Sequence, residues 1–185
     1  MDHDLVARAA GCTRCALSAT RHHVVVGSGS LGSRLVLVGE APGAAEDAGG
    51  EPFIGRSGRL LFELIASELD LTRDQCYVTN VVKCRPPANR TPRAAELEAC
   101  RPWWLEQRRA VGAAVIVTLG NTATRAVLDT REPISTLRGR AVALDDAVVV
   151  PTFHPAAAVR GGPNVVAMMR ADLLVVAHEL ALRSP

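Results

Sequence analysis

Four short, mostly apolar segments, separated by stretches in which apolar residues recur at helical spacing, restrict the folds that this chain can adopt. They are Leu35–Val38, Cys76–Lys83, Ala114–Leu119 and Val148–Pro151. Such segments are typical of strands that are buried on both faces of a parallel sheet. Because strand and helix patterns alternate four times, the sequence predicts an α/β fold: a four-stranded parallel sheet flanked by helices on both faces. We expect residues 1–185 to form a single domain.

Composition excludes some classes of protein and leaves others open. With 185 residues, of which 48% are hydrophobic, the chain can bury one sizeable core. A net charge of +2 neither requires nor excludes DNA as a partner. No stretch approaches the roughly 18 apolar residues of a membrane span, and the N-terminus, with Asp2, Asp4 and Arg8, lacks a signal-peptide pattern. We therefore expect a soluble, cytoplasmic protein that acts as a monomer and has no membrane partner.

Polar residues and glycines gather where the predicted strands end. Glu40, Gly120 and His154 each follow a strand, and Asn80 lies toward the end of its own. The loop after the first strand, GEAPGAAEDAGGEPFIG, combines many glycines with four carboxylates and the lone aromatic Phe53. Because parallel strands end at a common edge, where ligands bind, these residues should converge. The sequence thus predicts a site with carboxylates, an amide, an imidazole and an exposed phenyl ring.

Local patterns add expectations about particular elements. Thr91 should cap a helix that has Pro92 at its first position, and Asn121 should cap the helix after the third strand. Residues 129–146 look irregular. Gly27–Gly32 matches G-x-G-x-x-G but leads directly into a strand, so we interpret it as a flexible turn rather than a dinucleotide site.

The five cysteines point to metal or redox chemistry, because disulfides are uncommon in the cytosol. Cys12 and Cys15 form a C-x2-C pair, whereas Cys84 and Cys100 are widely spaced. No strand precedes Cys12, which argues against a thioredoxin-like motif. Spacing alone leaves an iron–sulfur cluster, a zinc site and unlinked buried cysteines equally open. Cys76, next to an apolar strand, is expected in the core.

Four motifs together resemble those of the family 4 uracil-DNA glycosylases, which carry a [4Fe-4S] cluster. They are GEAPGAAEDAGGEPFIGRSGRLL, VTNVVKCRPPANRTP, TLGNTA and FHPAAAVR. The similarity extends from Cys12 to the last helix. It implies a uracil-DNA glycosylase-like fold and a DNA repair enzyme that flips uracil out of single- or double-stranded DNA. Such an enzyme hydrolyses the N-glycosidic bond and leaves an abasic site.

The resemblance also implies roles for individual residues. Phe53 would stack on uracil, Asn80 would read its edge and His154 would face the leaving base. Glu40 would be the catalytic carboxylate, with Glu46 or Asp47 as the alternative. Ala41 would stand in the uracil pocket at the position where family 1 enzymes have an aspartate. The expected phosphate contacts are Arg56, Ser57 and Arg160. The cluster ligands that the resemblance implies are Cys12, Cys15, Cys84 and Cys100.

One segment departs from the family pattern. Relatives commonly place leucines after the His-Pro pair, where they wedge into the base stack, whereas this chain has Ala156, Ala157, Ala158 and Val159. A smaller wedge holds the flipped nucleotide less firmly. We therefore expect weaker activity on duplex DNA, relative to single strands, than the family pattern implies.

Two other functions are compatible with parts of the sequence. A covalent uracil-DNA-binding relative carries a basic, histidine-containing insertion ahead of the last cluster cysteine, and this chain has no histidine between Cys84 and Cys100. A non-catalytic iron–sulfur nucleic-acid-binding module would not need Glu40, Asn80 and His154 together. Both alternatives are therefore less favoured than the glycosylase.

Overall fold

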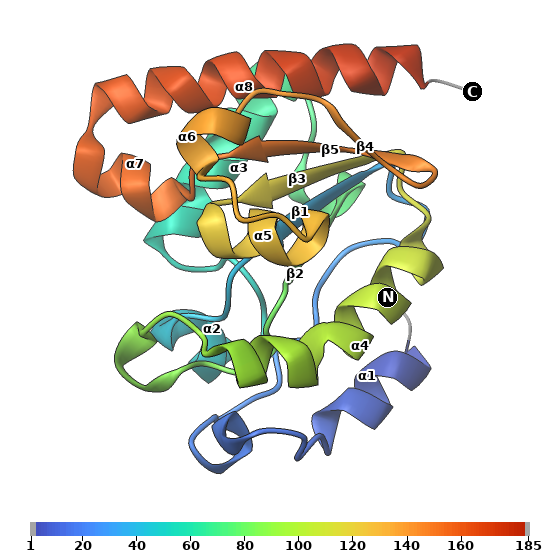
Figure 1. Cartoon of the computed structure of the whole chain (residues 1–185), viewed down its shortest axis with the longest axis vertical. Coiled ribbons are helices and arrows are strands. Elements are labelled where there is room, and N and C mark those ends of the chain that lie inside the picture. The colour runs from blue at the N-terminus through green and yellow to red at the C-terminus, as the bar shows by residue number, and fades with distance from the viewer. Residues whose placement is uncertain (1–2, 184–185) are drawn as a thin grey trace.

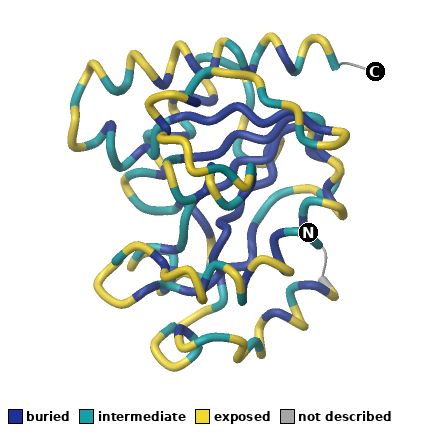
Figure 2. The backbone as a smooth tube through the Cα atoms, viewed as in Figure 1, coloured by how far each residue is buried: buried dark blue, intermediate teal, exposed yellow. Residues whose placement is uncertain are grey.

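The computed structural model describes residues 3–183, which form an α/β fold around one five-stranded sheet (Figure 1). The strand order is β2-β1-β3-β5-β4. The bounds are β1 Leu35–Gly39, β2 Cys76–Asn80, β3 Val115–Leu119, β4 Val142–Leu144 and β5 Ala147–Thr152. Strands β2, β1, β3 and β5 are parallel and correspond to the four predicted segments. Every residue in these four strands is buried, as their apolar sequences predict (Figure 2).

The predicted strand count was wrong by one. β4 lies within the stretch that looked irregular and pairs antiparallel with β5 at the edge of the sheet. Its three residues are only partly buried or exposed, so they show no apolar run. Asp145, with φ 52°, makes the tight turn that returns the chain into β5. Pairing with a neighbouring strand, rather than local composition, therefore creates this element.

Helices cover both faces of the sheet, as predicted. On one face are α3 (Arg56–Leu69), α7 (Pro155–Gly161) and α8 (Pro163–Leu182). On the other are α1 (His3–Ala10), α4 (Ala94–Val111) and α5 (Asn121–Leu128). Short helices α2 (Ala44–Gly49) and α6 (Ile134–Leu137) and the 3-10 turns Ala16–Ala19, Arg73–Gln75 and Pro87–Asn89 complete the described chain. Each face has its own apolar cluster, so the sheet is enclosed by two layers of side chains.

Two predicted helix starts were wrong by a few residues. α4 begins at Ala94 rather than Pro92, because the Glu96 carboxylate accepts a hydrogen bond from the Arg93 N–H at 2.8 Å and pairs with Arg90. Asn121 does not cap α5 but is its first residue. Its side-chain oxygen accepts instead from the backbone N–H of Ile134 at 2.8 Å, which ties α5 to α6.

The glycine-rich segment before β1 forms no helix, which confirms that it is not a dinucleotide fingerprint. Ser28 pairs with Val78 in an isolated antiparallel bridge. Gly29 has φ 113°, and a Cβ there would lie 2.2 Å from the Cys76 carbonyl oxygen. Within residues 3–183, no helix combines the length and apolar character that crossing a membrane requires.

Candidate active site

A cavity of about 570 Å³ opens at the carboxyl ends of the parallel strands. β1, β2, β3 and β5 all end there, because their pairing is parallel and in register. The predicted site residues that line the cavity are Glu40, Ala41, Glu46, Phe53, Ser57, Asn80, His154 and Arg160. Arg56, the exposed first residue of α3, and the buried Asp47 are not among its lining residues. The topology therefore brings most of the expected site into one place.

Asn80 presents an unsatisfied polar atom to this cavity. Its side chain is 2% exposed, and its Oδ1 has no hydrogen-bond partner among the described residues. Its main chain is held firmly, because the buried Lys83 ammonium donates a hydrogen bond to the Asn80 carbonyl. A buried acceptor without a partner costs about 1–3 kcal/mol. Such an atom in a cavity wall marks a position where a ligand supplies the missing donor.

Gly39, at the end of β1, makes room for two of these side chains. It is the register partner of Asn80. A Cβ on Gly39 would lie 2.3 Å from Asn80 Oδ1 and 2.5 Å from a ring carbon of Phe53. Any larger residue would therefore displace both groups from the cavity.

Phe53 is buried rather than exposed, which corrects the expectation from the sequence. Only 7% of its surface is accessible, and its φ of 55° lies in the left-handed region. Arg73 holds this strained segment by donating to the Pro52 carbonyl at 2.5 Å and the Phe53 carbonyl at 3.4 Å. The Phe53 ring is nearly parallel to the His154 ring, at 29°, with centroids 6.0 Å apart. The two rings therefore lie side by side at the cavity.

His154 has a defined tautomer when it is neutral. Its Nδ1 accepts a hydrogen bond from the Ala156 N–H at 3.1 Å, so the proton belongs on Nε2. Burial, with a smaller contribution from Arg160 and against the opposing effect of Glu46, lowers the pKa of His154 to about 4. The imidazole is thus neutral at pH 7, with an Nε2–H group that can donate.

The three candidate carboxylates have different surroundings. Both oxygens of Glu46 accept from loop amides, those of Gly43 at 3.1 Å and Gly55 at 2.9 Å. Glu40 lines the cavity, and its carboxylate has no hydrogen bond or ion pair with any described residue. Glu46 is therefore occupied in holding the loop, whereas Glu40 is available for chemistry.

Asp47 points away from the cavity. It accepts hydrogen bonds from the backbone N–H of His22 at 2.9 Å and from the His22 ring at 2.7 Å. Burial alone would raise the pKa of Asp47, but the bonds from His22 and His23 lower it overall. Both histidines are exposed. Asp47 thus joins the N-terminal segment to α2.

Sequence reasoning missed other cavity residues. Asn89, Arg90, Asn121 and Thr122 also line it. They follow the ends of β2 and β3, so the rule that ligands bind at strand ends could have found them. Lys83, which does not line this cavity, ends the predicted buried segment Cys76–Lys83 and is buried, at 1% exposed. Its hydrogen bond to the Asn80 carbonyl was not predicted.

The four predicted cluster cysteines lie together at the N-terminal side of α4. One small cavity is lined by Cys12, Cys15, Cys84 and Cys100. Three N–H groups donate to these sulfurs: Trp103 Nε1 to Cys12 at 3.4 Å, the Lys83 amide to Cys100 at 3.2 Å and Arg21 Nη1 to Cys84 at 3.5 Å. Thiolate ligands of iron–sulfur clusters characteristically accept such bonds. The donor set therefore fits a cluster.

Among the described residues, no group of three or more His, Cys, Asp or Glu side chains fits around a single metal ion. A cubane differs, because each of its four thiolates binds a different iron and the sulfurs stand farther apart. Cys76 lies on the opposite face of the sheet, fully buried, and burial raises the pKa of its thiol to about 11. Its predicted place in the core is confirmed.

The sequence of this chain is similar to those of known proteins. Residues 26–174 match the family model of the uracil DNA glycosylase superfamily. A type-4 uracil-DNA glycosylase from Thermotoga maritima is 45% identical over 83% of this chain and 80% of its own. One from Sulfurisphaera tokodaii is 38% identical over 92% of this chain and 80% of its own. A type-5 enzyme from Pyrobaculum aerophilum is 38% identical, but over only 54% of this chain. The chain therefore belongs to the uracil DNA glycosylase superfamily, with the type-4 enzymes as its relatives over most of its length.

Proposed function

We propose that this chain is a monofunctional uracil-DNA glycosylase that starts base excision repair. It flips uracil out of DNA, hydrolyses the N-glycosidic bond and leaves an abasic site. The unpartnered amide oxygen of Asn80, buried in a cavity beside Phe53 and His154, is the observation that carries this proposal. The relatives named type-4 uracil-DNA glycosylase support it.

Asn80 distinguishes uracil from cytosine. Uracil presents an N–H and a carbonyl oxygen side by side, whereas cytosine presents a bare nitrogen and an amino group. Asn80 Oδ1 accepts from the uracil N–H and its amide N–H donates to the carbonyl, so cytosine mismatches twice. Phe53 contributes about 1–3 kcal/mol by stacking on the base, which offsets part of the cost of flipping.

His154 stabilises the departing uracil. Breaking the bond leaves negative charge on the base and positive charge on the sugar. The Nε2–H of the neutral imidazole donates to the uracil oxygen on which charge develops. The ring is already neutral, so it needs no deprotonation before the reaction. The hydrogen bond from the Ala156 N–H to Nδ1 fixes the orientation of the ring in advance.

Glu40 stabilises the sugar cation and orients or deprotonates the attacking water. Its carboxylate is free within the described part of the chain, whereas Glu46 is bound to two loop amides. Glu46 therefore acts by holding the loop, and Ala41 contributes only its small size and backbone to the uracil pocket.

DNA phosphates bind along the rim of the cavity. Ser57 lies in the first turn of α3, where backbone N–H groups favour anions, and Arg160, in α7, also lines the cavity. Arg56 contacts the strand just outside the cavity. Ala156 at the rim is a small wedge, which supports a preference for single strands over duplex DNA.

We also propose that Cys12, Cys15, Cys84 and Cys100 hold a [4Fe-4S] cluster. When bound, the cluster would supply four iron–thiolate bonds that tie the N-terminal segment to the loop after β2 and to α4, and it would transfer no electrons in the reaction. We further propose that residues 1–185 form one domain and act as a monomer. Purified protein should contain about four irons and four labile sulfides per chain. Cys76→Ser should retain them, and colourless protein with one zinc per chain would contradict the cluster.

Release of uracil from uracil-containing oligonucleotides tests the proposed activity. We expect free uracil, an abasic strand and multiple turnover, with no product from the matching cytosine oligonucleotide. A protein–DNA adduct that survives denaturation and disappears in His154→Ala would instead identify a covalent binder. Tight binding of uracil-DNA without any product would identify a non-catalytic module.

A further inference from the structure

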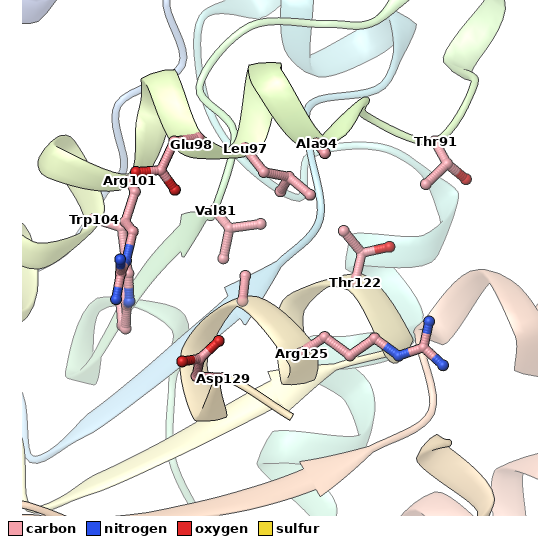
Figure 3. A pocket seen from close by; sticks show the side chains of 11 residues that line it. Val81, Thr91, Ala94, Leu97, Glu98, Arg101, Trp104, Thr122, Arg125 and Asp129 are labelled. Carbon is pink, nitrogen blue, oxygen red and sulfur yellow. The ribbon is translucent and has the colours of Figure 1, made fainter. Parts of the chain in front are cut away.

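A second cavity, of about 370 Å³, lies between α4 and α5 (Figure 3). We call it the α4–α5 pocket. Its principal lining residues are Val81, Leu97, Arg101, Trp104, Thr122 and Arg125. The functions proposed above for the catalytic cavity and the cysteines use none of its charged side chains.

The α4–α5 pocket adjoins the catalytic cavity. Thr91, in the loop before α4, and Thr122, in the first turn of α5, line both spaces. A strand whose flipped nucleotide occupies the catalytic cavity can therefore reach the α4–α5 pocket with an adjacent nucleotide. Any occupant of this pocket that belongs to the same strand is a near neighbour of the uracil.

The pocket offers two kinds of surface. Val81, Leu97 and Trp104 provide an apolar floor, and Figure 3 shows Val81 and Leu97 between the two helices. At the rim, the exposed Arg101 has no hydrogen bond or ion pair with the described residues, and Arg125 donates only to the Arg131 carbonyl, at 3.3 Å. The pocket therefore combines an apolar surface that suits a base with the free guanidinium of Arg101, which suits a phosphate, and this combination matches the chemistry of a nucleotide.

Two carboxylates share the rim with the arginines. Glu98 and Asp129 are both exposed and have no hydrogen-bond or ion-pair partner within residues 3–183. They would repel a second phosphate, so the pocket is not a general anion site. Carboxylates accept instead from the exocyclic amino groups of bases, which favours cytosine, adenine or guanine over thymine or uracil.

We propose that the α4–α5 pocket binds an unpaired nucleotide that neighbours the flipped uracil in single-stranded DNA. In a duplex this neighbour is stacked and paired, and entering the pocket would require a second flipping event. A single strand carries no such cost. The pocket thus adds affinity for single strands only. This inference rests on the proposed function and extends its substrate contacts beyond the uracil.

The test uses single-stranded oligonucleotides in which one nucleotide at a time, near the uracil, is replaced by an abasic spacer. The measured quantities are kcat and KM for uracil release by the complete protein. We expect a spacer at one position on one side to raise KM by about fivefold or more, as loss of one base contact does, with kcat unchanged. At that position, an oligonucleotide with thymine should have a higher KM than one with cytosine.

Two variants and a control connect this effect to the pocket. Arg101→Ala removes the free cation, and Ala94→Trp places a large side chain in the pocket from an exposed position at the start of α4. Both should raise KM for the intact single strand, leave KM for duplex DNA unchanged and make the spacer effect disappear. Arg183→Ala, at the end of α8 on the other face of the sheet, loses the same charge and should change neither value.

The proposal fails if both variants keep the single-strand KM within twofold of the unaltered protein. It also fails if they raise KM equally for single strands and duplexes, because that result would indicate general electrostatic attraction. Equal spacer effects at all positions would contradict it as well. Failure of the proposed function is distinct, because no oligonucleotide would then release uracil.

Discussion

The active-site cavity and the polar network behind it are both buried and both polar, yet they differ in how their atoms are satisfied. In the network, the Lys83 ammonium donates to Thr79 Oγ1 and to Gln107 Oε1. The Gln107 amide donates to the Val26 carbonyl at 2.7 Å and to the Tyr77 hydroxyl at 2.9 Å. Each of these side chains has a partner within the chain, so the network stabilises the native structure.

In the cavity, three groups lack such partners among the described residues. They are Asn80 Oδ1, the Glu40 carboxylate and His154 Nε2. Asn80 belongs to both regions, because its carbonyl is held by Lys83 while its side chain faces the cavity. The contrast predicts that removing one of these three groups lowers activity more than stability, and that substitutions in the network lower stability more than activity.

The largest effect is expected from His154→Ala. Loss of a donor to the developing anion should lower kcat by a factor on the order of 10² or more, whereas loss of the bond from the Ala156 N–H at the start of α7 should cost only about 1 kcal/mol of unfolding free energy. Single-turnover excision and denaturant unfolding measure the two quantities. His178→Ala, an exposed histidine on α8, is the matched control and should behave as the unaltered protein. Native activity in His154→Ala would remove the imidazole from the mechanism.

Glu40→Gln compared with Glu46→Gln separates the two carboxylates. Glu40→Gln should lower kcat by about 10²-fold with no loss of stability, because its carboxylate is free. Glu46→Gln weakens two charge-assisted bonds to loop amides, so it should cost about 1–3 kcal/mol of unfolding free energy. Circular dichroism in urea and excision rates provide the comparison. The reverse pattern would assign the catalytic role to Glu46.

Asn80→Ala and Thr79→Ala test the boundary between the two regions directly. Asn80→Ala loses two hydrogen bonds to uracil, so excision should fall by about 30-fold or more, with stability unchanged since Oδ1 has no internal partner. Thr79→Ala, one residue earlier, removes a bond to the Val26 carbonyl and should cost about 1–3 kcal/mol of stability. Equal loss of stability in both variants would contradict the distinction between the cavity groups and the polar network.

A further expected effect is in the pH dependence of stability. The pKa of His154 is about 4 in the folded protein, against about 6.5 in the unfolded chain. Between these values the unfolded chain binds more protons, so the free energy of unfolding rises as pH increases from about 4 to 6.5 and is flat above. Imidazole NMR titration should give a midpoint near 4, and His154→Gln should remove this part of the pH dependence. A midpoint near 6.5 would show that the ring is solvated and charged in acid.

Much of the site's position could be predicted because burial constrains sequence strongly. Strands enclosed on both faces must be apolar, and parallel strands must end at one edge. Glu40, Asn80 and His154 could therefore be placed together from their positions after or at the end of apolar runs. Their chemical roles stay predictions, and so do the ligand roles of the four cysteines.

Tertiary structure alone decided the remaining features, because each depends on contacts between residues far apart in the chain. β4 exists only by pairing with β5. Phe53 is buried because Arg73 and the Gly39 gap hold it against the sheet. Glu46 and Glu40 look equivalent in sequence, and only the fold of the loop brings the Gly43 and Gly55 amides to one of them. The sequence thus determined which segments are buried and where polar groups gather, while long-range packing decided which of those groups are left free to bind.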